Sequence, residues 1–585
     1  MQAHAFLIAI AVGFVTAAWG YPAEENSFLA EVLPAELSRH AREIVRHVRP
    51  SGSPGELAAI DYIVTTLRSE AIPVEVYEFS AYLSDPVHAS FRIETPEPRE
   101  FPALTQVFSA STGPGGLSAE VVDRGKGEPA DYAKGEVRGK VVLVDGLADP
   151  DGVQAAQQAG AIGAVFASTS DRVNEMTVGP VWGMPEPEDL RLLPRIPSVA
   201  VTREAGAEIR RRLRSGAVRI QLATEVATGF KTLRLPVATI RAARDPEGFV
   251  LLGGHIDAWH YGGTDEGASN AALVEMARIF YRHRGELERG LKVAWWPGHS
   301  NGRYAGSTWY VDAFWPEIRS HALAYLNIDG VGQKEASLYS VSATAELTPL
   351  ARSVVREQAG VEPSAERPGR NSDQSFYGVG LPLLQFNHAR SAEIGGYWWW
   401  HTPEDSFDKI DFEILATDTR LYVAALHRLL TPPVPPLQLS AATAELRQLL
   451  SERSGPAGGT LSLGAAVERA ERLDNLARSL DDRLSRGPGE LEPGEVSRRL
   501  VRFLRPLTRV TYQERGPYHQ DPALERKRLP GLAALERLST LGSQPHLFGF
   551  TRGYLVRELN RLLDHLDQAL AEGEALAGEL AGPQQ

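Results

Sequence analysis

The stretch GFVLLGGHIDAWHYGGTDEGASNAALVEMAR, from Gly248 to Arg278, decides the fold of this 585-residue chain. It opens with an apolar run typical of a buried strand, passes through a glycine-rich loop, and ends in a segment whose apolar residues recur at helical spacing. Strand, loop and helix in this order form the unit of a parallel sheet flanked by helices. His255 and Asp257 follow the apolar run, and Asp265 lies just before the helix.

The same alternation continues over residues 235–431, in LKVAWWP, HALAYLNIDG and LPLLQFNH. It predicts an α/β fold, a mostly parallel mixed sheet flanked by helices. Asp329 closes one apolar run, and His401 follows another in YWWWHTPEDSFD. Because the carboxyl ends of parallel strands share one edge of a sheet, we expect these side chains to meet His255 and Asp265 there.

Three further regions flank this unit. Residues 21–85 read as helix and then strand, and we assign them to the first segment of the same domain. Residues 86–234 contain GKVVLVDG, a small-residue helix and RIPSVAVT, which predict an inserted β-rich domain. After the linker TPPVPP, residues 437–585 predict a helical domain. Its leucine stripes favour ordinary helix packing, with a subunit interface as the alternative.

Composition excludes several classes of function. The formal net charge of -13 argues against nucleic acid as a partner, because no basic surface is available to neutralise phosphates. The chain has no cysteine, so it has neither disulfides nor thiolate metal ligands. Any metal ion must therefore be held by His, Asp and Glu side chains.

The N-terminus carries an apolar run from Ala5 to Ala18, followed by small residues. Its length is typical of a signal peptide, which we assign to residues 1–20, and it is short for a bilayer span. We therefore expect export to the periplasm or the medium, with no stable membrane span after signal removal. The segment before the run lacks Lys and Arg, so a buried N-terminal helix is the alternative.

The polar residues at the predicted sheet edge suit a divalent ion. Neutral imidazole and carboxylate ligands around an open coordination position are what a zinc-like ion needs. His255, Asp265, Asp329 and His401 supply both kinds of ligand. Asp257 stands two residues beyond His255, where its carboxylate can accept the other ring N–H and fix the tautomer.

At this point the sequence resembles a known family. The motifs LLGGHIDAWHYGGTDEGASNAALVEMAR, AGSTWY, YLNIDG, NSDQSFYGVGLPLLQF and WHTPEDSFDKID are similar, in order and spacing, to those of co-catalytic zinc exopeptidases. The similar branch contains glutamate carboxypeptidase II and the transferrin receptor. The resemblance implies a protease-associated insert at residues 86–234 and a dimerisation-type domain at residues 437–585, and hence a homodimer.

The resemblance also implies a metal site with one or two zinc ions. In it His255 binds one ion, Asp329 and His401 bind the second, and Asp265 bridges both. The family adds an adjacent Glu-Glu pair, in which the first is the general base and the second completes the ion of the first histidine. Here that pair falls in PGHSNG, on His299 and Ser300 or on Ser300 and Asn301, and no carboxylate is present.

Three interpretations of this gap remain open. His299 replaces the pair as ligand or base, since imidazole does both near neutral pH. Alternatively, the chain is a catalytically silent, receptor-like binding protein that keeps the peptidase fold. In the third interpretation one ion remains and acts on a non-peptide amide or ester. Joint retention of the other site residues favours a metal-dependent, exopeptidase-like hydrolase of peptide or related amide bonds. Glu266 is an alternative base, although a carboxylate at a helix N-terminus explains it more simply.

The sequence gives little information about substrate preference. Arg303 and Arg370 are candidates to bind a substrate carboxylate, since guanidinium pairs with carboxylate in two parallel hydrogen bonds. Trp400, beside His401, is a candidate for the wall of a pocket that holds an apolar side chain. The sequence does not distinguish amino- from carboxypeptidase action.

Overall fold

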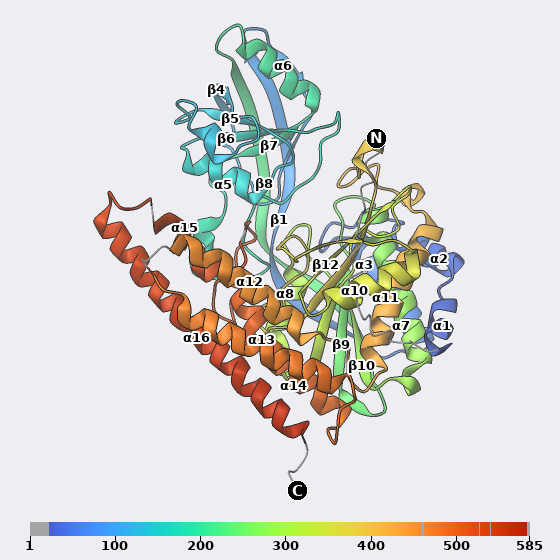
Figure 1. Ribbon diagram of the computed structural model, residues 1–585. Helices are drawn as coiled ribbons and strands as arrows, with labels where there is room; N and C mark the ends of the chain where they lie inside the picture. The colour runs from blue at the N-terminus through green and yellow to red at the C-terminus, as the bar shows by residue number, and fades with distance from the viewer. Residues whose placement is uncertain (1–22, 458–460, 526, 539, 582–585) are drawn as a thin grey trace, which may run out of the picture.

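The computed structural model describes residues 23–457, 461–525, 527–538 and 540–581, and the predicted signal peptide lies outside them. Three parts are visible: a central sheet with helices, an upper part built from residues 96–218, and a helical tail (Figure 1). Within the described residues no helix combines the length and hydropathy needed to cross a bilayer.

The central sheet is mixed and mostly parallel. Its strands run in the order β13-β12-β14-β11-β9-β10-β8, and β9 pairs in parallel with both β10 and β11. The bounds are β9 (Asp245–His255), β10 (Arg289–Trp296), β11 (Ala322–Asn327), β12 (Leu338–Ala343), β13 (Ser364–Glu366) and β14 (Leu383–Ala389). The fold class predicted from the sequence is confirmed, and the runs FVLLGGH, LKVAWW, ALAYLN and LLQFNH are strands, whereas YWWW before His401 is a turn.

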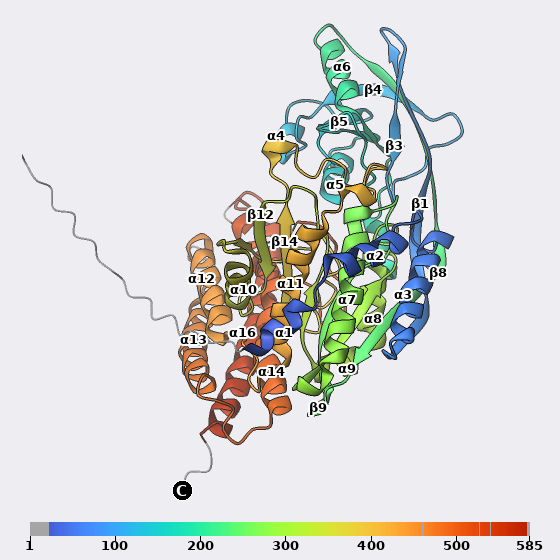
Figure 2. The same ribbon diagram turned by 90° about the vertical axis from the view of Figure 1, so that its right-hand side faces the viewer.

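Helices cover both faces of this sheet (Figure 2). They are α1 (Ala23–Ala30), α2 (Pro34–Ile44), α3 (Pro54–Ser69), α7 (Ala268–Arg282), α8 (Ala305–Ala313), α9 (Trp315–His321), α10 (Thr348–Ala359) and α11 (Phe412–Leu430). Buried apolar side chains of these helices and of the strands form one continuous core. That core fixes the carboxyl ends of β9, β10 and β11 relative to one another, and the site lies at these ends.

A long antiparallel ribbon links the sheet to the upper part. β1 (Val74–Thr95) pairs with β8 (Arg219–Ile240) over almost its whole length. The expected domain boundaries at residues 86 and 234 fall inside these two strands, so the insert grows out of the ribbon without a linker. It contains β2 (Arg99–Phe101), β3 (Ala103–Thr105), β4 (Leu117–Asp123), α4 (Pro129–Tyr132), β5 (Val141–Asp145), α5 (Pro150–Gln158), β6 (Gly163–Ala167), β7 (Ser198–Val201) and α6 (Arg203–Leu213).

The tail is a helical layer packed against the central domain (Figure 1). Its helices are α12 (Leu439–Ala457), α13 (Gly464–Leu484), α14 (Pro493–Tyr512), α15 (Leu535–Leu538) and α16 (Pro545–Glu579). The predicted stripes face inward: Leu473 and Leu480 of α13, and Leu562 and Leu566 of α16, are buried within the single chain. They therefore pack helices of one chain together, which is the interpretation that the sequence favoured.

Candidate metal centre

The predicted site residues converge at one edge of the sheet. His255 is the last residue of β9, and Asp329 lies two residues beyond β11. Asp265 lies in the turn that leads into α7, and His401 lies in the loop that follows β14. The structure thus brings together all four residues that the sequence nominated as metal ligands.

Three of the four residues form one compact group. One potential ligand atom from each of His255, Asp265 and Asp329 lies within 4.8 Å of the others. Asp329 lies close to His255 because β11 and β9 are neighbouring strands. Asp265 lies between the two histidines: its Oδ1 is 3.5 Å from His255 Nε2, and its Oδ2 is 3.4 Å from His401 Nε2.

The donor set fits a divalent ion such as zinc. It offers imidazole nitrogen and carboxylate oxygen at a buried position, the combination that zinc accepts when thiolates are absent. Glu266 adds a fully buried carboxylate whose two oxygens have no hydrogen-bond partner among the described residues. Its Oε1 lies 3.8 Å from His255 Nε2. Buried carboxylates without donors need a compensating cation, and a metal ion supplies one.

The pKa values reflect this crowding of charge. Burial alone would lower the pKa of His255, but the hydrogen bond to Asp265 and the charges of Asp265 and Asp329 raise it to about 10. Burial would raise the pKa of Asp265, yet the two histidines hold it below its ordinary value. Burial lowers the pKa of His401 to about 4. His401 is therefore neutral at physiological pH and suited to act as a ligand.

Two buried groups hold the loop between β9 and α7. Asp405 accepts hydrogen bonds from the Thr264 and Asp265 amides at 2.9 and 3.0 Å, which places the Asp265 side chain at the centre. The Arg49 guanidinium donates only to main-chain carbonyls, among them those of Ile256 and Gly262. The Arg49 guanidinium thus places a positive charge near the acidic cluster, but it donates no hydrogen bond to a carboxylate of that cluster.

The inserted domain fixes His401. The Nδ1 of His401 is 2.7 Å from the Glu175 carbonyl, and the Glu175 amide donates to the His401 carbonyl at 3.1 Å. Asn174 Nδ2 donates to the Trp400 carbonyl at 2.6 Å. Since Nδ1–H is engaged by a carbonyl, the Nε2 lone pair faces Asp265. Trp400 stacks on the His401 ring, and Trp259 meets that ring edge-on.

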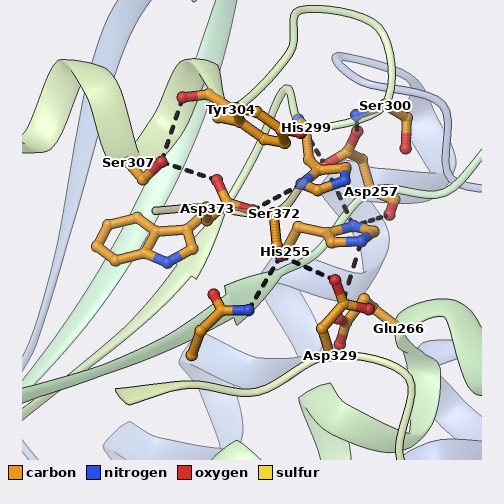
Figure 3. A network of polar contacts seen from close by, with 12 residues as sticks. His255, Asp257, Glu266, His299, Ser300, Tyr304, Ser307, Asp329, Ser372 and Asp373 are labelled. Atoms are coloured by element: carbon orange, nitrogen blue, oxygen red, sulfur yellow. Dashed lines mark hydrogen bonds and ion pairs between the residues drawn. The ribbon is translucent and has the colours of Figure 1, made fainter. Parts of the chain in front are cut away.

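His299 enters the site from the loop after β10, as Figure 3 shows. Its ring stacks on that of His255, with centroids 3.8 Å apart and an interplanar angle of 11°. Its Nδ1 lies 2.7 Å from Asp373 Oδ2, and the Ser307 hydroxyl donates to Asp373 Oδ1 at 2.8 Å. Asp373 thus fixes the imidazole and leaves Nε2 as the ring nitrogen not engaged by it.

Asp257 does not have the contact expected from the sequence. His255 Nδ1 lies 2.7 Å from the Asp257 carbonyl, whereas the Asp257 carboxylate is 3.9 Å away. That carboxylate accepts from the His299 amide, the Ser300 amide and the Ser51 hydroxyl. The tautomer of His255 is therefore set by the backbone. The carboxylate of Asp257 instead shapes the loop that carries His299.

The other residues in place of the missing glutamate pair have structural contacts. Ser300 gives its carbonyl to the Thr177 hydroxyl of the inserted domain at 2.9 Å. Asn301 Oδ1 accepts from the Ser51 amide at 3.2 Å, and its Nδ2 donates to the Ser84 carbonyl. Of the three positions, only His299 brings a group that binds metal or exchanges protons into the centre.

The three candidate substrate residues have different surroundings. Arg370 forms an ion pair with the buried Asp521 of the tail, so its guanidinium already has a carboxylate partner, although it lines the same pocket as Arg303. Arg303 lines a pocket of about 360 Å³ and makes no ion pair within the described residues. Trp400 lies against His401 as described above.

Sequence reasoning did not identify two groups of the centre. Glu266 was interpreted as a helix N-terminal carboxylate, but no backbone amide of the first turn of α7 donates to it, and the Ser269 hydroxyl is the first-turn group that lowers its pKa. Asp373 lies within the quoted motif NSDQSFYGVG, yet its distance in sequence from His299 gave no reason to connect the two. The available signal for Asp373 was its place inside a motif that carries the resemblance.

Comparisons with known proteins agree with this geometry. Residues 237–425 match Peptidase family M28, and residues 117–209 match the PA domain. The chain is 25% identical over 463 residues to a protein described as "Probable glutamate carboxypeptidase AMP1" from Arabidopsis thaliana, covering 65% of this chain and 64% of that relative. It is 29% identical over 326 residues to "Probable lipoprotein aminopeptidase LpqL" from Mycobacterium tuberculosis, covering 54% and 61%.

Solved structures show the same fold. An aminopeptidase from Aneurinibacillus sp. strain AM-1 matches with a TM-score of 0.55 and 22% identity, over 70% of this chain and 96% of that one. A zinc aminopeptidase from Bacillus subtilis matches with a TM-score of 0.54 and 19% identity, over 69% and 95%. The chain therefore has the fold of these aminopeptidases, and within it residues 237–425 match the model of Peptidase family M28 and residues 117–209 that of the PA domain.

Proposed function

We propose that this M28-type chain with its PA insert is a metal-dependent, exopeptidase-like hydrolase of peptide or related amide bonds. The observation that carries the proposal is the buried group of His255, Asp265 and Asp329, whose potential ligand atoms lie within 4.8 Å of one another. His401 faces the same Asp265 from the other side. A silent binding protein has no need for this set of charged groups in its interior, where each one costs stability.

The side chains divide the chemistry between them. His255, Asp265 and Asp329 would hold a zinc-like ion, which supplies Lewis acidity toward a carbonyl and lowers the pKa of bound water. His299, held by Asp373 through Nδ1, presents Nε2 as the proton acceptor in place of the glutamate that relatives use. Asp373 keeps the imidazole in that orientation and stabilises its protonated form, as a carboxylate beside a catalytic histidine does.

The donor set also bears on the number of ions. The His255 side offers three or more ligands, whereas His401 has only the shared carboxylate of Asp265 among the described residues. We propose one tightly held ion, with any second ion bound weakly at His401. Zinc is the metal that the donor set and the names of the structural neighbours favour.

The substrate is proposed to be a peptide or a small amide. Trp400 and Trp259 flank His401 and offer apolar surface to a substrate side chain. Arg303 offers a cation without a carboxylate partner in the described residues, which suits a substrate carboxylate. The relatives include both carboxypeptidase and aminopeptidase names, so either end of a peptide is a candidate.

A small peptide library tests the proposal. Each peptide is supplied in four forms, with its N-terminus free or acetylated and its C-terminus free or amidated, and products are read by mass spectrometry. We expect zinc-dependent release of single terminal residues, abolished by a chelator and by His255→Ala. A zinc-loaded protein that releases no residue from any form would favour the silent binding protein.

We also propose that the chain forms a homodimer through its tail. The supporting feature is an exposed apolar stripe at the start of α16, formed by Leu547, Phe550 and Tyr554, of which Phe550 is 75% exposed. Light scattering at micromolar concentration would show twice the chain mass, reduced to one chain by Phe550→Glu. A wild-type monomer would refute the dimer.

Export remains a proposal that rests on the apolar run Ala5 to Ala18. We expect the mature protein in the periplasm or the medium, with its N-terminus near residue 21. N-terminal sequencing of protein recovered from each cell fraction tests this. An intact Met1 in the cytoplasmic fraction alone would refute it.

A further inference from the structure

The carboxylate of Glu266 is the unexplained charge of the centre. Its side chain is 0% exposed, and neither oxygen has a hydrogen-bond partner within the described residues. The neighbouring buried carboxylates are satisfied: Asp257 accepts from two amides and a hydroxyl, and Asp373 from Ser307. Asp405 likewise accepts from two amides. A carboxylate left without donors in the interior is strongly destabilising unless it takes up a proton or a cation compensates it.

Glu266 faces the proposed metal ligands. Its Oε1 lies 3.8 Å from His255 Nε2, the same nitrogen that is 3.5 Å from Asp265 Oδ1. In Figure 3 the carboxylates of Glu266 and Asp329 lie side by side next to the His255 ring. Burial, and then the charge of Asp329, raise the pKa of Glu266 well above its ordinary value. Two carboxylates in this position repel each other unless a proton or a cation is shared between them.

Two simpler explanations for Glu266 do not fit the contacts. α7 begins at Ala268, and none of its first-turn amides donates to the Glu266 carboxylate. Arg49 is the nearest buried guanidinium in the acidic cluster, but its N–H groups donate to carbonyls, including those of Ile256 and Gly262. Neither the helix terminus nor Arg49 therefore compensates Glu266. In the metal-free protein the nearest cation is the His255 imidazolium, whose Nε2 is 3.8 Å from Oε1, and a bound metal ion would take the place of its proton.

We propose that Glu266 is a further protein ligand of the ion held by His255, Asp265 and Asp329. This inference rests on the proposed metal-dependent function and adds to it the residue that completes the site. The loop after β10 has no carboxylate at residues 299–301, and Glu266 supplies a carboxylate to the centre from the loop before α7. The His255 side would then hold its ion with one imidazole and three carboxylates.

Zinc titration of the metal-free protein by calorimetry tests the inference. Glu266→Gln keeps the shape of the side chain and removes its charge, and we expect its zinc affinity to fall at least about tenfold, in the range that perturbing a metal site typically costs. The matched control is Glu346→Gln, which changes another buried glutamate whose carboxylate accepts from the Thr344 hydroxyl. That variant should bind zinc like the wild type.

Thermal unfolding of the same variants separates a ligand from a structural residue. Without metal, Glu266→Gln should be at least as stable as the wild type, since it removes a repelling carboxylate beside Asp329. With zinc, it should gain less stability than the wild type, because a weaker ligand stabilises less at the same concentration. A structural role instead predicts a loss of stability without metal and unchanged zinc affinity.

The outcomes distinguish the two proposals. Zinc binding by the wild type that is lost in His255→Ala and unchanged in Glu266→Gln would overturn the assignment of Glu266 and leave the metal centre standing. A wild-type protein that takes up no zinc would overturn both. Weakened zinc binding in Glu266→Gln together with an unchanged Glu346→Gln supports the inference.

Discussion

The two histidines of the centre have opposite surroundings. His255 is crowded by acidic side chains, and its pKa is raised to about 10. His401 faces one shared carboxylate, lies against two tryptophans, and has a pKa lowered to about 4. The same side chain at two positions of one sheet edge therefore has two electrostatic states.

This difference teaches where the chemistry is concentrated. The His255 side has the carboxylates, and His299 stacks on it with its own carboxylate, Asp373. The His401 side has aromatic surface and is held by the inserted domain through Asn174 and Glu175. We infer that the His255 side binds the ion and moves protons, and that the His401 side contacts substrate.

The largest expected effect is on His299. Replacing it by Ala should lower kcat by about 10²–10⁴, the usual cost of losing a general base, while zinc content stays at the wild-type value. Steady-state kinetics and elemental analysis on the same preparation measure both. His47→Ala, at an exposed histidine, is the control. Loss of zinc in His299→Ala would make His299 a ligand, and unchanged kcat and zinc would remove it from the chemistry.

The pH dependence of zinc binding should be the next largest effect. A raised pKa means that protonated His255 stabilises the metal-free fold below about pH 6.5, and that this contribution is lost as the pH rises through about 10. Zinc must displace that proton, so its affinity should rise about tenfold per pH unit between pH 7 and 9. Calorimetry at several pH values measures the slope. A flat profile would contradict the charge assigned to His255.

Asp373→Asn should have a smaller effect than loss of His299. It leaves the imidazole in place but removes the charge that stabilises its protonated form, so we expect kcat to fall about 10–100-fold, less than the about 10²–10⁴ that loss of the base itself costs. The acid limb of the pH profile should move to lower pH, because the imidazole becomes a weaker base. A purely structural role for Asp373 predicts no shift of that limb.

The smallest effect is expected from the inserted domain. Asn174→Ala removes one side-chain hydrogen bond to the Trp400 carbonyl, worth about 1 kcal/mol. Hydrogen exchange at the His401 loop should accelerate a few-fold, and the zinc affinity of the His255 side should not change. A fall in the zinc affinity of the His255 side in this variant would show that the His255 and His401 sides of the centre are coupled.

The sequence predicted those site residues that lie at or just beyond the ends of strands. His255, Asp265, Asp329 and His401 each follow an apolar run or precede a helix, and a parallel sheet must bring such positions together. Glu266 could not be assigned in this way, because neighbouring residues in a turn point in different directions, and only coordinates show which carboxylate enters the site. Asp373 comes from a loop that precedes its strand, which the strand-end argument does not cover.

Of the fold, too, some elements were predictable from the sequence and others were not. Runs such as FVLLGG and LKVAWW are buried on both faces, so their composition alone predicted strands. The ribbon of β1 and β8 was recognised only at its start, because much of its length is exposed on both faces and carries no clear alternation. The leucine stripes of the tail were read correctly as buried faces, but sequence did not show that the same chain covers them.

Zinc content per chain after loading and dialysis tests the central claim most directly. We compare the wild type with His255→Ala and His401→Ala in one experiment. The account predicts about one ion retained by the wild type and by His401→Ala, and none by His255→Ala. A wild type that retains no zinc, or an ion that depends on His401 and not on His255, would contradict it.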